Sequence, residues 1–336
     1  MLPLTDVRPT LADVAYAAGV SLATASRVLS GFHQVRPETR RQVEQAVDRL
    51  GYVRQRAGRM RGRRRTGLIA VTVCEDGDRL FADPYFSRIL SGINRELAAT
   101  DHHAVLLTME PAHKSLALRH LSADHVDGAL IISVHARHAG ALARVEVPMV
   151  TVGRPLGVDP SRCSILDADN HGGAAHAVRH LIGAGRTRIA TVAGPKDMAA
   201  GVDRLAGFRD ALGDRFHPGL VAHGDFGLPS GEHAALRLLD HRPDVDAIFA
   251  ASDLMAVGAL RALRRIGRRV PDDVAVIGFG NAPISRTTDP PLTTVRQPVE
   301  ELGARAARAL LALIDGTLSG QRQTVLDTEL VVRRSA

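Results

Sequence analysis

Cysteine is scarce in this chain of 336 residues, which has only Cys74 and Cys163. Two cysteines that stand alone and far apart in the sequence give neither a disulfide framework nor the paired spacing of a metal knuckle. This usage fits a reducing compartment, and we expect a cytoplasmic protein.

Long apolar runs are also missing, which excludes a membrane-spanning helix, because such a helix needs roughly 18 to 20 apolar residues. The N-terminal stretch "MLPLTDVRPT" lacks the charged-then-apolar order of a secretory signal. With 45% hydrophobic and 24% charged residues, the composition is that of an ordinary globular protein. The length is sufficient for about two domains, each with its own core.

The motifs of common enzymes are absent as well. The chain has no G-x-G-x-x-G after a strand, no G-x-x-x-x-G-K-[ST] and no G-x-S-x-G. The pairs His102–His103 and His135 with His138 lack a third ligand at metal-site spacing, so we expect these histidines at the surface. We therefore predict no catalytic residue, no metal and no cofactor. The enzyme alternative predicts turnover without DNA binding.

Charge is distributed very unevenly along the chain. Residues 1–65 contain 13 arginines, no lysine and 5 acidic residues, a formal net charge of +8. The remaining 271 residues hold 30 bases and 31 acids, a net charge of −1. The segment "VRQRAGRMRGRRR" (53–65) alone has seven arginines. A small basic domain of this kind is typical of nucleic-acid binding, whereas a merely solvated surface would not segregate its charge in this way.

The basic head has the pattern of three short helices. The stretch "LADVAYAA" (11–18) has apolar residues at helical spacing, and Gly19 then breaks the helix. Ser21 can cap a second helix, "LATASRVLS", and Pro37 suits the first turn of a third, whose buried stripe is Val43, Ala46, Val47 and Leu50. This order predicts a helix-turn-helix unit whose second helix enters the DNA major groove. From spacing alone, a bundle for protein contacts is the alternative.

From residue 66 onward, short β-rich runs alternate with helical stretches. The runs are "GLIAVTV", "HAVLLT", "GALIIS" and "PMVTVG", then "RIATVAG", "DAIFAAS" and "VAVIGFG", with later helices near 199–213, 229–240 and 253–266. This alternation through two halves predicts two parallel sheets, each flanked by helices. Ligands bind such sheets beyond the carboxyl ends of the strands, here in a cleft between the halves.

The head closely resembles that of the lactose-repressor (LacI/GalR) family of bacterial transcription regulators. The resemblance is carried by "TLADVAYAAGVSLATASRVLSG" and "VRPETRRQVEQAVDRLGY". It implies that Leu22 and Ala23 are the main base-reading residues, where they can pack against a thymine methyl, and that Arg27 reaches a base or phosphate. Leu22 could instead close the helix packing. The implied DNA-binding residues are Thr10, Ser21, Leu22, Ala23, Thr24, Ser26 and Arg27, with Arg54, Gln55, Arg59, Met60 and Arg61 in the basic segment.

The body resembles the effector domain of the same family, which shares its fold with periplasmic sugar-binding proteins. The stretches "DPYFSRILSGI", "RLAGFRDAL", "FAASDLMAVGALRAL" and "VPDDVAVIGF" are among those that carry the resemblance. The expected fold is α/β: an all-α helix-turn-helix head and a two-subdomain, periplasmic-binding-protein-like (type I) effector domain with parallel sheets. The expected boundaries are a head at 1–51, a basic hinge at 52–65, one subdomain at 66–167 and 299–326, and the other at 168–298 and 327–336.

The resemblance also implies a set of pocket residues. Arg204 matches a ligand-binding arginine, whose guanidinium suits hydroxyl pairs or a carboxylate. Phe226 stands where an aromatic ring often stacks on the ligand. Asp253 matches a pocket carboxylate but could equally cap a helix, and Tyr85 and Phe86 could be core residues. The implied effector-binding residues are Tyr85, Phe86, Ser133, Arg204, Phe226, Asp253 and Asn281.

The chain departs from the family pattern at several positions. Gly153 and Gly280 stand where polar pocket groups are common, which favours a smaller, modified or less polar effector, or a degenerate pocket. In the hinge, relatives carry a leucine that wedges into the minor groove, and Arg61 occupies its position. Either Met60 acts as the wedge in a shifted register, or the arginines bind a narrow, A·T-rich minor groove.

These expectations combine into a repressor controlled by a small effector, possibly a sugar or sugar derivative. A homodimer would present two heads to a pseudo-palindromic DNA operator, and ligand in the cleft would change DNA affinity. After "TVLDTELVVRR" no heptad-patterned helix follows, which favours a dimer over a tetramer. A transport protein of the same fold would need an export signal and would not need a helix-turn-helix head. The sequence leaves open whether the effector releases DNA or acts as co-repressor.

Overall fold

The computed structural model describes residues 11–29, 36–50, 65–109, 114–121, 125–159, 161, 163–318 and 320–336. The chain forms two compact units, Met1–Arg64 and Arg65–Ala336. The first contains the predicted head, and the second contains the predicted effector domain. Within these described ranges, no helix combines the length and apolar character needed to cross a bilayer.

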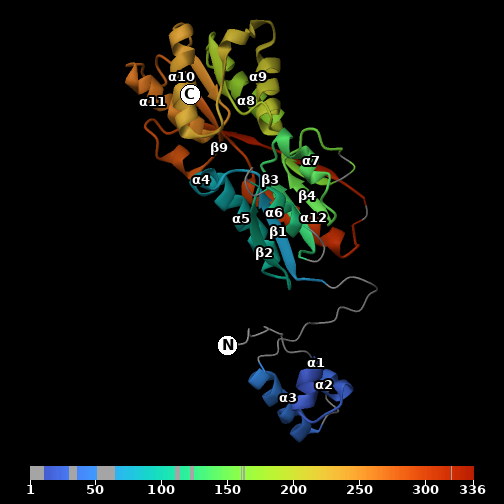
Figure 1. Cartoon of the computed structure of the whole chain (residues 1–336). Helices are drawn as coiled ribbons and strands as arrows, with labels where there is room; N and C mark the ends of the chain where they lie inside the picture. Colours follow the sequence, from blue (N-terminus) through green and yellow to red (C-terminus); the bar gives the residue numbers. More distant parts are fainter. Residues whose placement is uncertain are drawn as a thin grey trace, which may run out of the picture. The chain divides into compact units, whose positions relative to one another are not determined.

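The described part of the first unit consists of the helices α1 (Leu11–Ala17), α2 (Leu22–Leu29) and α3 (Pro37–Leu50) (Figure 1). Gly19 has a φ of +64°, a left-handed conformation that glycine adopts without strain and that turns the chain between α1 and α2. The Oγ of Ser21 accepts a hydrogen bond from the Thr24 N–H at 3.1 Å, so the predicted cap of α2 is confirmed.

A small apolar core holds the three helices together. Its buried members are Val14, Ala15, Ala25, Val28, Val43 and Ala46. Val47 and Leu50 pack against it, as the apolar stripe of the third helix predicted. Leu22 lies outside this core with 53% of its surface exposed, so the alternative in which it closes the helix packing is wrong.

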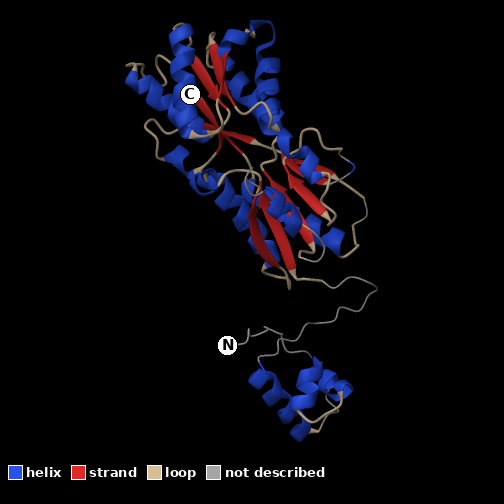
Figure 2. Cartoon of the chain, viewed as in Figure 1, coloured by secondary structure: helices blue, strands red, loops and turns tan. Residues whose placement is uncertain are grey.

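Two six-stranded sheets form the framework of the second unit (Figure 2). The first sheet has the order β11-β5-β4-β3-β1-β2, and every pair in it is parallel. The central strands are buried along their whole length, because helices cover both faces. The strands are β1 (Leu68–Val73), β2 (His103–Thr108), β3 (Gly128–Ile132), β4 (Met149–Val152), β5 (Ser164–Ala168) and β11 (Gln323–Leu326).

The second sheet has the order β12-β10-β9-β8-β6-β7. The pairs β10–β9, β9–β8, β8–β6 and β6–β7 are parallel, as predicted, whereas the edge strand β12 pairs antiparallel with β10. The chain leaves β11 at the carboxyl edge of the first sheet and enters the second sheet at its own carboxyl edge, so β12 must run opposite to its neighbour. The strands are β6 (Ile189–Ala193), β7 (Val221–His223), β8 (Ala247–Ala250), β9 (Ala275–Gly280), β10 (Thr293–Arg296) and β12 (Glu329–Val331).

Each sheet with its helices is called a lobe below. The helices of the first lobe are α4 (Gly77–Ala82), α5 (Pro84–Leu97), α6 (Lys114–His120), η1 (Ala136–His138), α7 (Ala139–Leu142) and α12 (Val299–Ile314). Those of the second are α8 (Asn170–Gly183), α9 (Ala199–Leu212), η3 (Gly213–Arg215), η4 (Pro218–Leu220), α10 (Leu228–His241), α11 (Asp253–Arg265) and η5 (Pro283–Arg286). In Figure 1, α12 lies among the blue and green elements of the first lobe, although it comes late in the sequence.

The chain passes between the lobes after β5, after β10 and after β11. Two glycines let the backbones of α5 and α12 come very close after the second crossing. A Cβ on Gly92 would lie 2.0 Å from the Glu300 carbonyl oxygen, and one on Gly303 would lie 2.3 Å from the Ile89 carbonyl oxygen. This contact fixes the start of α12, and with it the second crossing, against α5.

Candidate functional site

A cavity lies between the two lobes, where the carboxyl ends of both sets of strands meet. Its walls come from segments that follow β1, β3, β4 and β5 in the first lobe and β6, β7, β8, β9 and β10 in the second. Parallel sheets bind ligands at this edge because the loops there can vary without disturbing the strands. Six of the seven predicted effector residues line the cavity: Tyr85, Phe86, Ser133, Arg204, Phe226 and Asp253.

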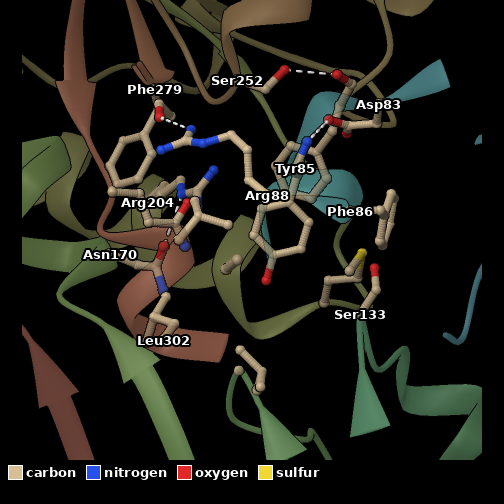
Figure 3. Close-up of a pocket in the computed structure, with 18 of the residues that line it drawn as sticks. Asp83, Tyr85, Phe86, Arg88, Ser133, Asn170, Arg204, Ser252, Phe279 and Leu302 are labelled. Carbon is tan, nitrogen blue, oxygen red and sulfur yellow. Dashed lines mark hydrogen bonds between the residues drawn. The ribbon is translucent and has the colours of Figure 1, made fainter. Parts of the chain in front are cut away.

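Arg204 on α9 is the buried cation of this cavity, with 6% of its surface exposed. Its Nε donates to the Asn170 Oδ1 at 2.9 Å, and its Nη1 donates to the Ala251 carbonyl oxygen at 2.6 Å. Its guanidinium carbon lies 3.7 Å from the centroid of the Phe279 ring, over which it stacks (Figure 3). Burial lowers the pKa of Arg204 to about 10, so the side chain stays charged at neutral pH.

Phe226 lies between arginines of both lobes. Its ring centroid is 5.6 Å from the guanidinium carbon of Arg79 in the first lobe and 5.5 Å from that of Arg204 in the second. The residue has a φ of +72°, which is strained for a side chain of this size. The Oγ of Ser252 donates to the Phe226 carbonyl oxygen at 2.7 Å and holds the backbone in this conformation.

Asp253 is a buried carboxylate at the start of α11, with 2% of its surface exposed. It accepts hydrogen bonds from the Thr294 hydroxyl and, at 2.6 Å, from the Ala282 N–H. Burial outweighs these hydrogen bonds and raises the pKa of Asp253 to about 6. The alternative in which Asp253 caps the helix is wrong, because the cap is Ser252, whose Oγ accepts from the Met255 N–H at 3.1 Å.

The first-lobe wall is built on the start of α5. Asp83 caps the helix by accepting from the Tyr85 N–H at 2.9 Å, as Figure 3 shows. The edge of the Tyr85 ring meets the Phe86 ring with 5.3 Å between centroids. Phe86 is both a core residue, 1% exposed, and part of the cavity wall, so the two readings of it do not exclude each other. Burial raises the pKa of both Asp83 and Tyr85.

Several polar residues of the cavity escaped the sequence reasoning. Asp167, at the end of β5, accepts from the Arg154 N–H at 3.0 Å and from the Asn170 Nδ2 at 2.9 Å, and burial raises its pKa. The signal was the polar stretch "DADN" (167–170), which begins in the last two residues of a buried strand and continues beyond its end. Gln297, which follows β10, also lines the cavity.

Two arginines connect the lobes at the cavity. The Nη1 of Arg88 on α5 donates to the Gly280 carbonyl oxygen at 3.0 Å, while its Nε donates to the Glu300 Oε1 at 2.7 Å. The Nη2 of Arg154 donates to the Asp203 Oδ1 on α9 at 2.7 Å. On two sides of the cavity, therefore, an arginine links one lobe to the other. A ligand in the cavity lies beside both links, so its binding affects the contact between the lobes.

The structure corrects the position of Asn281, which does not line the cavity. Its backbone takes a φ of +48° directly after β9, and its Oδ1 accepts from the Nη2 of Arg333 at 2.7 Å. Ser133 has a φ of +61° at the end of β3 and does line the cavity. The one-residue turn after β9 thus directs the asparagine to the C-terminal segment instead of the cavity.

In the head, the implied base-reading residues share one side of α2. Ser21, Leu22, Ala23 and Arg27 are exposed, and Thr24 and Ser26 are half-buried. Exposed apolar side chains beside an exposed guanidinium form a surface that can meet a DNA groove. The other implied DNA-binding residues lie outside the described residues: Thr10, Arg54, Gln55, Arg59, Met60 and Arg61.

Comparison with known families adds two matches. Residues 10–55 match the family described as bacterial regulatory proteins, lacI family. Residues 178–336 match the periplasmic binding protein-like domain. The two matches fall on the basic head and on a part of the body that contains most of the second lobe, together with α12 and β11.

Individual relatives match the chain over nearly its whole length. The HTH-type transcriptional regulator CelR of Thermobifida fusca is 45% identical over 335 residues, which cover 98% of each chain. A structure of the CelR–cellobiose complex has a TM-score of 0.79 at 44% identity and covers 98% of this chain and 100% of that one. The lac repressor dimer bound to operator and an anti-inducer has a TM-score of 0.80 at 28% identity, covering 98% and 99%.

Proposed function

The chain belongs to the lacI family of bacterial regulatory proteins and is a DNA-binding transcriptional regulator under effector control, and from this premise we propose that its effector is a disaccharide of the cellobiose type. The observation that carries the proposal is a cavity whose walls come from both lobes and combine aromatic rings with buried polar groups. The similarity to CelR, whose structure is that of a cellobiose complex, supports the same class of ligand.

The sequence alone led us to expect a smaller, modified or less polar effector, or a degenerate pocket, from the two glycines that depart from the family pattern, whereas we now propose that the space beside them takes a ligand longer than one sugar ring. Gly153 and Gly280 both line the cavity. A Cβ on Gly153 would have no heavy atom within 4 Å, and one on Gly280 would come no closer than 3.6 Å to the Asp253 carboxylate. The missing side chains therefore leave space inside the cavity, which a second sugar ring would fill.

Polar groups suitable for sugar hydroxyls remain around that space. Asp253, Asp167 and Arg204 offer carboxylate acceptors and a guanidinium donor pair, and Phe226 and Phe279 offer flat apolar faces. Pockets of this kind use aromatic walls for affinity and a few fixed polar groups for orientation. The polar groups that relatives carry at 153 and 280 are thus replaced in function by neighbouring carboxylates.

The proposed mechanism couples this cavity to DNA through the arrangement of the lobes. A ligand that contacts both lobes stabilises one arrangement and shifts operator affinity by the difference in its affinity for the two, typically roughly 5- to 150-fold. We propose that the protein acts in the cytoplasm as a homodimeric repressor whose two heads bind a pseudo-palindromic operator. The residues that we propose to contact DNA are those of α2, centred on Leu22, Ala23 and Arg27, together with the basic segment that follows the head.

The effector is tested by calorimetric titration of cellobiose into the full-length protein, with glucose and maltose for comparison. We expect cellobiose to bind, and Arg204→Lys to weaken binding at least tenfold because an ammonium cannot keep both hydrogen bonds and the ring stack. Arg209→Lys is the matched control, since Arg209 is exposed on the same helix and should leave affinity unchanged. Absence of cellobiose binding, or equal losses in the two variants, would contradict the proposal.

DNA binding is tested by selecting bound sequences from random DNA, with and without cellobiose. We expect enrichment of a pseudo-palindromic site, and a change in affinity for that site when cellobiose is added. Enrichment of sites without inverted repeats would contradict the proposal that a homodimer binds the operator. A palindrome whose binding ignores cellobiose would leave the regulator intact and overturn the proposed effector.

A further inference from the structure

A buried histidine joins the two lobes beside the cavity. His135 and His138 are 6% and 2% exposed, so the surface positions expected for them are wrong. The Nε2 of His135 lies 3.1 Å from the Glu75 Oε1 in its own lobe, and its Nδ1 lies 2.9 Å from the Asp197 Oδ2 in the other. The backbone reinforces the contact, because the Ala136 N–H donates to the Asp197 carbonyl oxygen at 2.7 Å.

Charged groups surround this contact on every side. Glu75 also accepts from the Ser133 hydroxyl at 2.6 Å and pairs with the Nη1 of Arg79 at 3.4 Å. Asp197 pairs with the Nη1 of Arg137 at 3.1 Å. The edge of the His138 ring meets the His135 ring with 5.7 Å between centroids. Of the two carboxylates, Glu75 is buried, and Asp197 keeps 41% of its side-chain surface exposed.

The two hydrogen bonds of His135 depend on the protons that its ring carries. An ionised carboxylate only accepts hydrogen bonds, and a neutral imidazole has a single N–H to donate. Both ring nitrogens face carboxylate oxygens, so both hydrogen bonds form only when the ring carries two protons. Burial is the largest single effect and alone would raise the pKa of Glu75 and of Asp197. The hydrogen bonds from His135, together with the charges of Arg79 beside Glu75 and of Arg137 beside Asp197, outweigh it and lower the pKa of both carboxylates, which keeps them ionised.

We propose that Glu75, His135 and Asp197 form a proton-gated latch, in which closure of the lobes takes up a proton at His135. When the ring loses a proton, one of its two nitrogens becomes an acceptor that faces a carboxylate oxygen, so one of the two hydrogen bonds is lost and His135 no longer joins Glu75 to Asp197. Arg137 still pairs with Asp197 in that state, but this pair is half exposed and contributes little by itself.

The latch shares residues with the cavity, so the two are coupled. Ser133 and Arg79, which both contact Glu75, line the cavity, and so does Met198, which forms an isolated β-bridge with His135. A ligand that draws the lobes together therefore also brings Asp197 to the ring of His135. By linkage, low pH favours the closed lobes and high pH favours the open ones.

Hydrogen exchange of the Ala136 amide tests the latch in the full-length protein without any ligand. Exchange of the peptides that span residues 133–138 is followed by mass spectrometry from pH 6 to pH 8.5 and corrected for the intrinsic rate at each pH. Because opening of the proposed latch releases one proton, we expect protection in the wild type to fall as the pH rises through this range, by up to tenfold per pH unit. Protection that does not change with pH would overturn the proposal.

Variants identify the group that titrates. His135→Gln keeps one hydrogen bond and should make protection independent of pH, and Asp197→Asn, at a half-exposed position that tolerates the change, should move the fall to lower pH. Asp203→Asn is the matched control, because it removes an inter-lobe ion pair, with Arg154, that contains no histidine. It should leave the pH dependence intact. An unaltered pH dependence in both latch variants would overturn the assignment to His135.

Discussion

Asp253 is buried in the wall of the cavity, and its effect on the free energy of unfolding depends on pH. Its folded-state pKa of about 6 lies above the ordinary value of 3.8. The folded state therefore binds the proton more tightly than the unfolded state. The stabilisation is complete below pH 3.8 and is lost as the pH rises through 6, a total of about 3 kcal/mol for a shift of about two units.

We expect the wild type to lose roughly 1–2 kcal/mol of unfolding free energy relative to Asp253→Asn between pH 5 and pH 8. The asparagine does not titrate, and its misplaced N–H against Ala282 costs the same at every pH. Urea unfolding of both proteins at the two pH values measures the difference. If the unfolding free energies of the two proteins changed by the same amount between pH 5 and pH 8, the carboxyl group would be ionised at both pH values.

Arg27 is the exposed guanidinium on α2 that can form two hydrogen bonds with a guanine, worth roughly 1–3 kcal/mol of discrimination. We expect Arg27→Ala to weaken binding to the selected operator by 10- to 100-fold and binding to random DNA much less. Fluorescence anisotropy at one fixed salt concentration measures both. Arg41→Ala removes the same charge from the exposed side of α3 and is the control. Equal losses on both DNAs would make Arg27 a phosphate contact.

At the scale of elements, the contact between α5 and α12 depends on two residues without side chains. A methyl group on Gly92 would overlap the Glu300 carbonyl oxygen, so we expect Gly92→Ala to destabilise the effector domain by about 1–3 kcal/mol or more. Gly183→Ala, at the open end of α8, is the matched control and should stabilise by up to about 1 kcal/mol. Urea unfolding measures the unfolding free energy of both variants. Equal values for the two would contradict the close approach of the α5 and α12 backbones.

The sequence predicted the elements well wherever local patterns determine them. The helices near 199–213, 229–240 and 253–266 are α9, α10 and α11 within a residue or two. The strands β5, β7 and β10 were not singled out, because they are short and two of them are rich in polar residues, so they owe their strand form to pairing with neighbours. The reversed direction of β12 could not be predicted, because it depends on where the chain re-enters the second lobe.

For the cavity residues too, the sequence predicted what local motifs determine and missed what depends on distant contacts. The positions of Arg204, Phe226 and Asp253 in one cavity followed from the resemblance of their motifs to the family, since the loops and helices that follow the strand ends bring them to one edge. The prediction that Asn281 lines the cavity was wrong, because the left-handed backbone of this single residue turns its side chain away from the cavity. The burial of His135 was invisible in the sequence, since it requires contact with Asp197, which lies 62 residues away in the other lobe.

At the scale of the whole molecule, we expect the basic segment between the head and the effector domain to decide how DNA is deformed. The leucine position of relatives is Arg61 here, and arginines favour a narrow minor groove over a wedge between base pairs. We therefore expect Met60→Ala to leave operator bending unchanged, as measured by fluorescence energy transfer between the operator ends. A loss of bending in this variant would make Met60 the wedge. Leu22→Ala is the control, because it should weaken DNA binding while the basic hinge stays unchanged.

The three crossings between the lobes have a consequence for synthesis of the protein. The head draws its three helices from the first 50 residues, as a unit of its own. The first lobe is incomplete until α12 and β11 have been translated, and the second until β12 has been added. A nascent chain on the ribosome therefore has its DNA-reading helix long before it has a finished cavity. Translation that stopped before α12 would leave a chain with the complete helices of the head and two incomplete lobes.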